Sequence, residues 1–83
     1  MNDELLRYRL LADRAGETVI LTKIDSYDIG AVIDEAHRLA SEQGEPVMIE
    51  FHTYSGWKSI SDLGYDGSVT GTEAHRPDLK AVA

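Results

Sequence analysis

Carboxylates are the most abundant chemically capable side chains in this sequence, and they concentrate in one stretch. The 83-residue chain carries a net charge of −7, and residues 25–50 hold seven acids against a single base, Arg38. Arg38 lies one helical turn from both Asp34 and Glu42, so it can neutralise part of this charge. The pattern predicts either a surface for a basic partner or an ordinary solvated helix face. The candidate partner-binding acids are Asp34, Glu35, Glu42 and Glu45.

Three aromatic or imidazole side chains form a second candidate group: His52, Tyr54 and Trp57. Exposed Trp and Tyr bury a large area at low entropic cost, which is typical of binding hot spots. These residues predict anchors for a partner, or a face that a second copy or another part of the chain covers. They also fit stacking on nucleotide bases, although the basic groove that usually accompanies such stacking is missing.

Catalytic and metal-binding patterns are weak. The chain has no cysteine, and His37, His52 and His75 lack the short spacing of metal ligands. The glycine-rich run 62–71 lacks the Lys-Ser/Thr of a phosphate loop, and no nucleophile elbow is present. We therefore expect a protein that is not an enzyme and has no cofactor and no metal.

The composition restricts the class of protein. A chain of 83 residues fits one small domain with a thin core. The excess of acids argues against direct binding to nucleic acid or to an anionic membrane. No apolar run is longer than Val19-Ile20-Leu21, far short of a membrane span. A soluble, cytoplasmic protein is the expectation.

One helix and one hairpin position the candidate residues. Apolar residues recur at helical spacing from Ile29 to Ala40, with Ser26 or Asp28 as cap and Gly44 as terminator, which predicts a helix over residues 28–43. Period-two alternation predicts a strand over 47–54. Ser55-Gly56 predicts a two-residue loop and a returning strand over 57–61.

That hairpin would pair Tyr54 with Trp57, His52 with Ser59 and Phe51 with Ile60. Two faces follow from the alternation. The predicted buried face contains Val47, Ile49, Phe51 and Ile60. The predicted opposite face contains Met48, Glu50, His52, Tyr54, Trp57, Ser59 and Ser61.

The remaining segments flank this unit. Residues 18–24 are rich in β-branched side chains and predict a strand. Residues 3–14 fit either a helix or a strand that forms a hairpin with 18–24 through a loop at 14–17. The chain from Gly64 to Ala83 loses periodicity and predicts a mobile tail, with a short strand near 68–72 as an option.

The predicted fold is α+β, a small antiparallel sheet with one amphipathic helix packed on one face. The element order is β-β-α-β-β, or α-β-α-β-β if the N-terminal segment is helical. The domain would span residues 1–63, with the tail over 64–83.

The Ile29–Ala40 helix, flanked by strands over 18–24 and 47–61 in a short acidic chain, resembles several small phage-encoded inhibitors. Anti-CRISPR proteins are the best-known group. The likeness covers residues 18–61, lies in size, charge and layout, and includes no shared motif, so it assigns no residue a role. It implies a non-catalytic inhibitor in the host cytoplasm that blocks a basic nucleic-acid-binding surface by direct contact, often with acidic side chains.

Three functions therefore remain open. The first is an inhibitor that docks an acidic face on a basic protein or nucleoprotein complex. The second is a homodimeric structural or accessory domain that buries the face containing Met48, His52, Tyr54 and Trp57. The third is a small module that binds a nucleotide or another ligand on the same aromatic residues.

Overall fold

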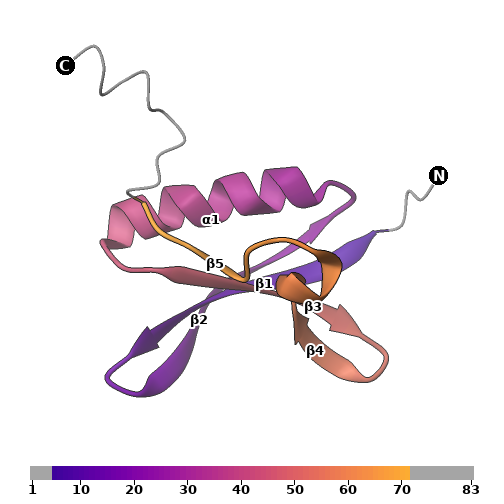
Figure 1. The fold of residues 1–83 in the computed structure, drawn as a ribbon, viewed down its shortest axis with the longest axis horizontal. Helices are drawn as coiled ribbons and strands as arrows, with labels where there is room; N and C mark the ends of the chain where they lie inside the picture. Colours follow the sequence, from indigo (N-terminus) through magenta and orange to yellow (C-terminus); the bar gives the residue numbers. More distant parts are fainter. Residues whose placement is uncertain (1–4, 72–83) are drawn as a thin grey trace, which may run out of the picture.

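A computed structural model describes residues 5–71. Its elements follow the β-β-α-β-β order, with a 3₁₀ turn and a short fifth strand after it (Figure 1). They are β1 (Leu6–Arg14), β2 (Glu17–Ser26), α1 (Ile29–Gln43), β3 (Val47–Thr53), β4 (Gly56–Ser59), the 3₁₀ helix η1 (Ile60–Leu63) and β5 (Ser68–Val69). The α+β prediction is confirmed, and the N-terminal segment is a strand, which removes the helical alternative.

The first hairpin turns through Ala15 and Gly16. Both residues have positive φ angles, 54° and 83°, and the flanking Arg14 and Glu17 pair with each other. Two positive φ angles in a two-residue loop are what a type I′ turn requires, and its twist matches that of the strands. β1 is therefore a strand despite the helical propensity of its residues, because propensity is a weak preference that tertiary pairing overrides.

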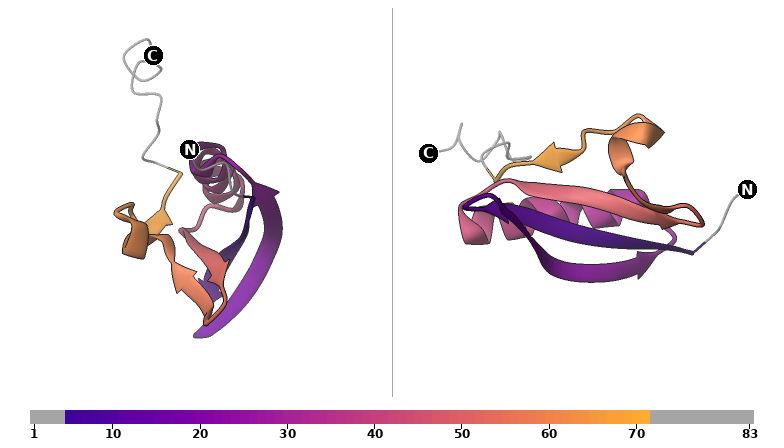
Figure 2. Two further views of the ribbon diagram at one scale, coloured as in Figure 1. Left: turned by 90° about the vertical axis from the view of Figure 1, so that its right-hand side faces the viewer. Right: turned by 90° about the horizontal axis from the view of Figure 1, so that it is seen from below.

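The sheet has the order β2-β1-β3-β4, with β5 pairing the same β3. Every pairing is antiparallel, so β2 and β3 run parallel to each other on either side of β1. Parallel strands need a crossover connection, and α1 supplies it by crossing one face of the sheet. Figure 2 shows α1 on one side of the strands, which leaves the other side, called the outer face below, without a helix.

The helix begins and ends as the sequence predicts. Asp28 is the N-cap, and its carboxylate accepts a hydrogen bond from the Gly30 amide at 2.9 Å. Ser26 supports the cap, because its hydroxyl accepts a hydrogen bond from the Asp28 amide at 3.0 Å. At the other end Gly44 has a left-handed φ of 71°. These contacts satisfy backbone groups that the helix ends leave free.

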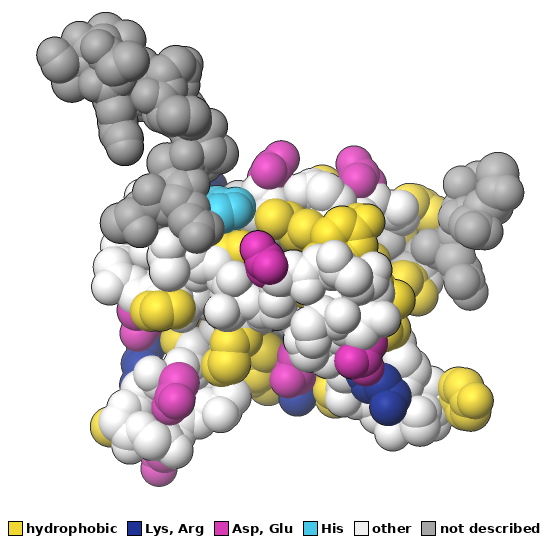
Figure 3. All heavy atoms as spheres, viewed as in Figure 1, with side chains coloured by type: hydrophobic (Ala, Val, Ile, Leu, Met, Phe, Trp, Pro, Cys, Tyr) yellow, Lys and Arg dark blue, Asp and Glu magenta, His cyan; other side chains and the backbone are white. Residues whose placement is uncertain are grey.

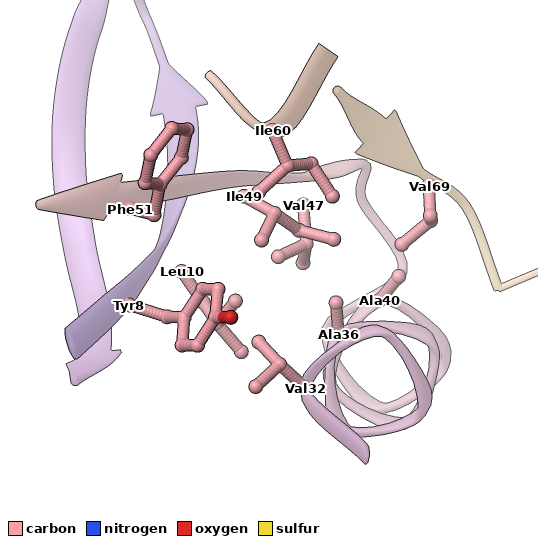
Figure 4. Close-up of a cluster of buried hydrophobic side chains, with 10 residues drawn as sticks. All are labelled: Tyr8, Leu10, Val32, Ala36, Ala40, Val47, Ile49, Phe51, Ile60 and Val69. Atoms are coloured by element: carbon pink, nitrogen blue, oxygen red, sulfur yellow. The ribbon is translucent and has the colours of Figure 1, made fainter. Parts of the chain in front are cut away.

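The core lies between α1 and the sheet (Figure 4). Small residues of the helix, Ala36 and Ala40, let it approach the strands closely, and Val32 completes its buried stripe. The sheet and the C-terminal segment supply the rest. The core comprises Tyr8, Leu10, Val32, Ala36, Ala40, Val47, Ile49, Phe51, Ile60 and Val69. The predicted buried face of the second hairpin is thus confirmed.

The predicted register of that hairpin is wrong by two residues. The loop is Tyr54-Ser55, Thr53 pairs with Gly56, and His52 pairs with Trp57. The Thr53 hydroxyl fixes this turn, because it accepts from the Ser55 amide at 3.1 Å and donates to the Gly56 carbonyl at 2.8 Å. A shift of two leaves His52 and Trp57 on their predicted face, whereas a shift of one would have exchanged the faces. Tyr54 and Ser61 were predicted on the same face, but Tyr54 lies in the turn and Ser61 in η1.

The returning strand is also shorter than predicted, since β4 stops at Ser59 and η1 begins at Ile60. The following segment stays with the domain. Val69 is buried, β5 pairs with Val47 and Met48, and the Ile49 amide donates to the Gly67 carbonyl at 2.9 Å.

The structure therefore places residues 64–71 with the folded unit and not with the tail predicted from Gly64. The remainder of that predicted tail, 72–83, lies outside the described residues, as does His75. No helix within residues 5–71 is long and apolar enough to cross a membrane.

Candidate interaction surfaces

The acids predicted on the helix are mostly occupied by arginines of the same chain. The Arg38 guanidinium donates to Glu35 at 3.0 Å and to Glu42 at 2.6 Å. Its hydrogen bond and charge hold the pKa of Glu35 below the usual value. Asp34 is exposed and makes no ion pair within residues 5–71. Of the helical acids in the predicted site, only Asp34 has no ion pair within residues 5–71.

Glu45 is also paired, and with a distant part of the sequence. Arg14 of the first hairpin donates to its carboxylate at 2.6 Å and to the Gln43 side chain at 3.0 Å. This contact joins the end of β1 to the loop between α1 and β3. Glu45 therefore holds two segments together, which gives this carboxylate a structural use.

The aromatic candidates separate into a pair and an isolated residue. His52 and Trp57 pair directly across β3 and β4, with ring centroids 4.9 Å apart in an edge-to-face arrangement. Tyr54 is fully exposed in the turn. The structure thus brings His52 and Trp57 together on the outer face and leaves Tyr54 at the tip of the hairpin.

Arg9 is a member of the outer-face cluster that the sequence prediction missed. Its guanidinium lies 4.4 Å from the centre of the Trp57 ring and donates to Glu50 at 2.7 Å. The alternation of Arg7, Arg9 and Leu11 places Arg9 on the outer face once β1 is a strand. Its proximity to Glu50 also requires the pairing of β1 with β3, and no local pattern in the sequence indicates that pairing.

The charges of the outer face are largely balanced by ion pairs. Arg7 donates to Asp25 at 2.9 Å, and Arg9 is paired with Glu50. Lys23 lies directly opposite Arg9 in the sheet and makes no ion pair within residues 5–71. Two of the three cations on this face are therefore already neutralised.

The two halves of the predicted site do not form one surface. Asp34, Glu35 and Glu42 belong to α1 on one side of the sheet, whereas His52 and Trp57 lie on the outer face (Figure 2). A single flat partner cannot cover both. The acidic residues and the aromatic pair must therefore be considered as separate candidate surfaces.

Besides Asp13 and Glu17 of the first hairpin, the carboxylates without an ion pair within residues 5–71 lie at the start of α1 and in or just after the η1 turn. The described acids in this group are all exposed, and they are Asp28, Asp34, Asp62 and Asp66. Leu63 and Tyr65 lie among them with 46% and 44% of their surface exposed. We call these six residues the α1–η1 surface.

One residue of each part of this surface, Asp28 and Tyr65, acts on the buried hydroxyl of Tyr8. Burial raises the pKa of Tyr8, and the negative charges of Tyr65, once it ionises, and of Asp28 raise it further. Figure 1 shows η1 and the start of α1 at the same end of the molecule. On the face shown in Figure 3, acidic side chains are spread over α1 and the segment beside it, with hydrophobic surface between them.

No family model, no curated protein and no solved structure matches the chain. Within residues 5–71 no group of three or more potential ligands is placed to hold a metal ion.

Proposed function

We propose that the chain is a non-catalytic binding protein that docks its α1–η1 surface on a basic surface of a protein or nucleoprotein complex. The observation that carries the proposal is the segment in and after η1, where two exposed carboxylates without an ion pair within residues 5–71, Asp62 and Asp66, flank two exposed apolar side chains, Leu63 and Tyr65. Charged groups steer the encounter and select the partner, whereas the apolar side chains supply buried area.

Unpaired carboxylates suit this role better than the acids first predicted from the sequence. A partner's lysine or arginine can approach Asp34, Asp62 or Asp66 without displacing another group of the same chain. At Glu35, Glu42 and Glu45 it must compete with Arg38 or Arg14. The paired acids contribute less, because their arginines cancel much of their field.

In its most concrete form the partner is a nucleic-acid-binding surface, where the carboxylates occupy the positions of phosphates. This is the mode of action that the resemblance to small phage-encoded inhibitors implies. The chain would then act as a competitor of nucleic acid in the host cytoplasm, without cofactor or catalysis.

The test is capture of partners from host lysate with the tagged chain at low and at high salt. The informative variant is Asp62→Asn with Asp66→Asn. Its matched control is Asp13→Asn with Glu17→Gln, which removes the same charge from exposed residues at the first hairpin. Asp28 is left intact because it caps α1.

We expect the parent and the control to retain a basic protein at low salt, and the Asp62/Asp66 variant to lose it. Added nucleic acid should compete with the chain for that protein. Equal capture by both variants, with the same salt dependence, would show that the α1–η1 surface is not the contact.

A further inference from the structure

The outer edge of β2 is a second surface, and it lies at the opposite side of the sheet from β4 and η1. β2 pairs with β1 at every position except Leu21, and no strand within residues 5–71 pairs with its other edge. An unpaired edge presents a row of amide and carbonyl groups that a further strand can pair with.

Only the second half of this edge is regular. The register slips between Leu10 and Leu11, which leaves Leu21 without a direct partner in β1. Bulges of this kind twist an edge and disfavour further pairing. After the bulge, residues 22–26 pair one for one with residues 10–6. A new strand would therefore add to residues 22–26.

Residues 22–26 of β2 are complementary in charge to the same residues of a second copy. If two copies pair in antiparallel orientation with Ile24 facing Ile24, Lys23 of each copy faces Asp25 of the other. Lys23 and Asp25 both lie on the outer face, opposite Arg9 and Arg7 of β1. Thr22 then faces Ser26, and Ile24 lies on the helix side opposite Tyr8. Residues directly opposite in a sheet share a face, and Asp25, an exposed carboxylate already paired with Arg7 of β1, would take Lys23 of the other copy as a second partner.

The charges around Lys23 within one copy favour pairing with a second copy. Lys23 faces Arg9, and like charges directly opposite are unfavourable. A second copy would bring a carboxylate next to Lys23 on its free side. A lysine on an edge usually discourages pairing. Here Asp25 follows Lys23 two residues later. The charges therefore favour the register in which Lys23 of one copy faces Asp25 of the other, and they disfavour registers in which like charges face each other.

We propose that two copies of the chain associate through residues 22–26 of β2, about a twofold axis at Ile24, and form one continuous sheet. The η1 part of the α1–η1 surface, with Asp62, Leu63, Tyr65 and Asp66, stays free in both copies because η1 follows β4, at the opposite side of the sheet from β2. A dimer would therefore present that surface twice, and a partner with two basic sites would be held more tightly.

The test is sedimentation velocity from about 10 μM to about 1 mM, the range in which a small strand-to-strand interface associates. We expect the parent to dimerise in this range. Lys23→Asp alone and Asp25→Lys alone should each weaken dimerisation about tenfold or more, because each replaces two attractive pairs with two repulsive ones. The matched control is Lys58→Asp, an exposed lysine of β4.

Mixing the two single variants provides the decisive result. The Lys23→Asp chain and the Asp25→Lys chain should form a heterodimer, although neither forms a homodimer, and the double exchange should restore the homodimer. Circular dichroism checks that each variant is folded. A parent that stays monomeric at about 1 mM, or a mixture that shows no heterodimer, would overturn the proposal.

Discussion

Arginines of β1 connect this strand to three different parts of the chain. Arg7 holds Asp25 of β2, Arg9 holds Glu50 of β3, and Arg14 holds Glu45 of the loop after α1. Exposed ion pairs contribute little to stability. Arg9 differs from the others, because its side chain is 23% exposed, that of Glu50 is 28% exposed, and its guanidinium stacks on Trp57.

Arg9→Ala should therefore destabilise the fold by about 1–2 kcal/mol, since it removes a charge-assisted hydrogen bond and the contact with Trp57. Arg7→Ala, which breaks an exposed pair, is the control and should have a clearly smaller effect. Urea denaturation followed by Trp57 fluorescence measures both. An equal decrease in the free energy of unfolding for Arg9→Ala and Arg7→Ala would show that the partly buried contacts of Arg9 stabilise the fold no more than an exposed ion pair does.

Tyr8 makes the stability sensitive to alkaline pH. Burial, followed by the charges of Tyr65 and Asp28, raises the pKa of Tyr8 above its ordinary value of 10.0. The folded state thus favours the neutral phenol, so the free energy of unfolding should fall as the pH rises above 10. Tyr8→Phe should flatten this decline, whereas Tyr27→Phe at an exposed site should leave it unchanged. Urea titrations between pH 8 and pH 11 measure the slopes.

The first turn contains a residue whose backbone conformation is energetically unfavourable. Ala15 has a φ of 54°, a conformation that residues with a Cβ seldom adopt. Ala15→Asn should stabilise the chain by about 0.5–1 kcal/mol, because Asn tolerates this conformation and Asn-Gly is the preferred type I′ pair. Gly16→Ala, at a φ of 83°, is the opposite control and should destabilise. Thermal denaturation of both variants checks the sign.

The segment after η1 depends on a close approach to the helix. A Cβ at Gly71 would lie 2.5 Å from the Ser41 Cα and 2.8 Å from its amide nitrogen. Gly71→Ala should therefore push the segment away from α1 and destabilise the fold by about 1–3 kcal/mol. Gly67→Ala is the comparison, since the atom nearest its Cβ would be the Ser59 hydroxyl at 2.7 Å, a side-chain atom that can move at the cost of its hydrogen bond to the Ser61 amide, whereas the atoms near Gly71 belong to the helix backbone. A smaller loss for Gly71→Ala than for Gly67→Ala in chemical denaturation would contradict the observed packing.

At the scale of the whole molecule, the sequence predicts the elements better than their partners. The helix can be predicted from the sequence because its apolar periodicity and both of its caps involve residues that are close together in the chain. β1 is ambiguous because Leu11, on the outer face opposite Met48, is as buried as Tyr8 and Leu10, which masks the alternation. The pairing of Arg14 with Glu45 spans 31 positions and follows from the strand order, which no local pattern encodes.

The same distinction between local patterns and tertiary pairing applies to the candidate site. Alternation correctly places His52 and Trp57 on one face, and their direct pairing depends on the Thr53 hydroxyl in the turn. The acids were predicted as a group, but their availability depends on which arginines reach them. The α1–η1 surface combines residues from two segments, so its existence requires the tertiary fold.

The place of β1 between β2 and β3 also has a consequence for synthesis. β2 follows β1 immediately, but Arg9 and Glu50, which face each other across β1 and β3, are 41 positions apart. At about 5–20 residues per second, a ribosome needs roughly 2–8 s to make the intervening chain. The first hairpin is complete only when Ser26 has been made, so for the last roughly 1–5 s of that interval it is exposed on the side that β3 later covers, and the nascent chain has an open strand edge. Pausing of translation between β2 and β3 should therefore increase aggregation, whereas pausing after β3 should not.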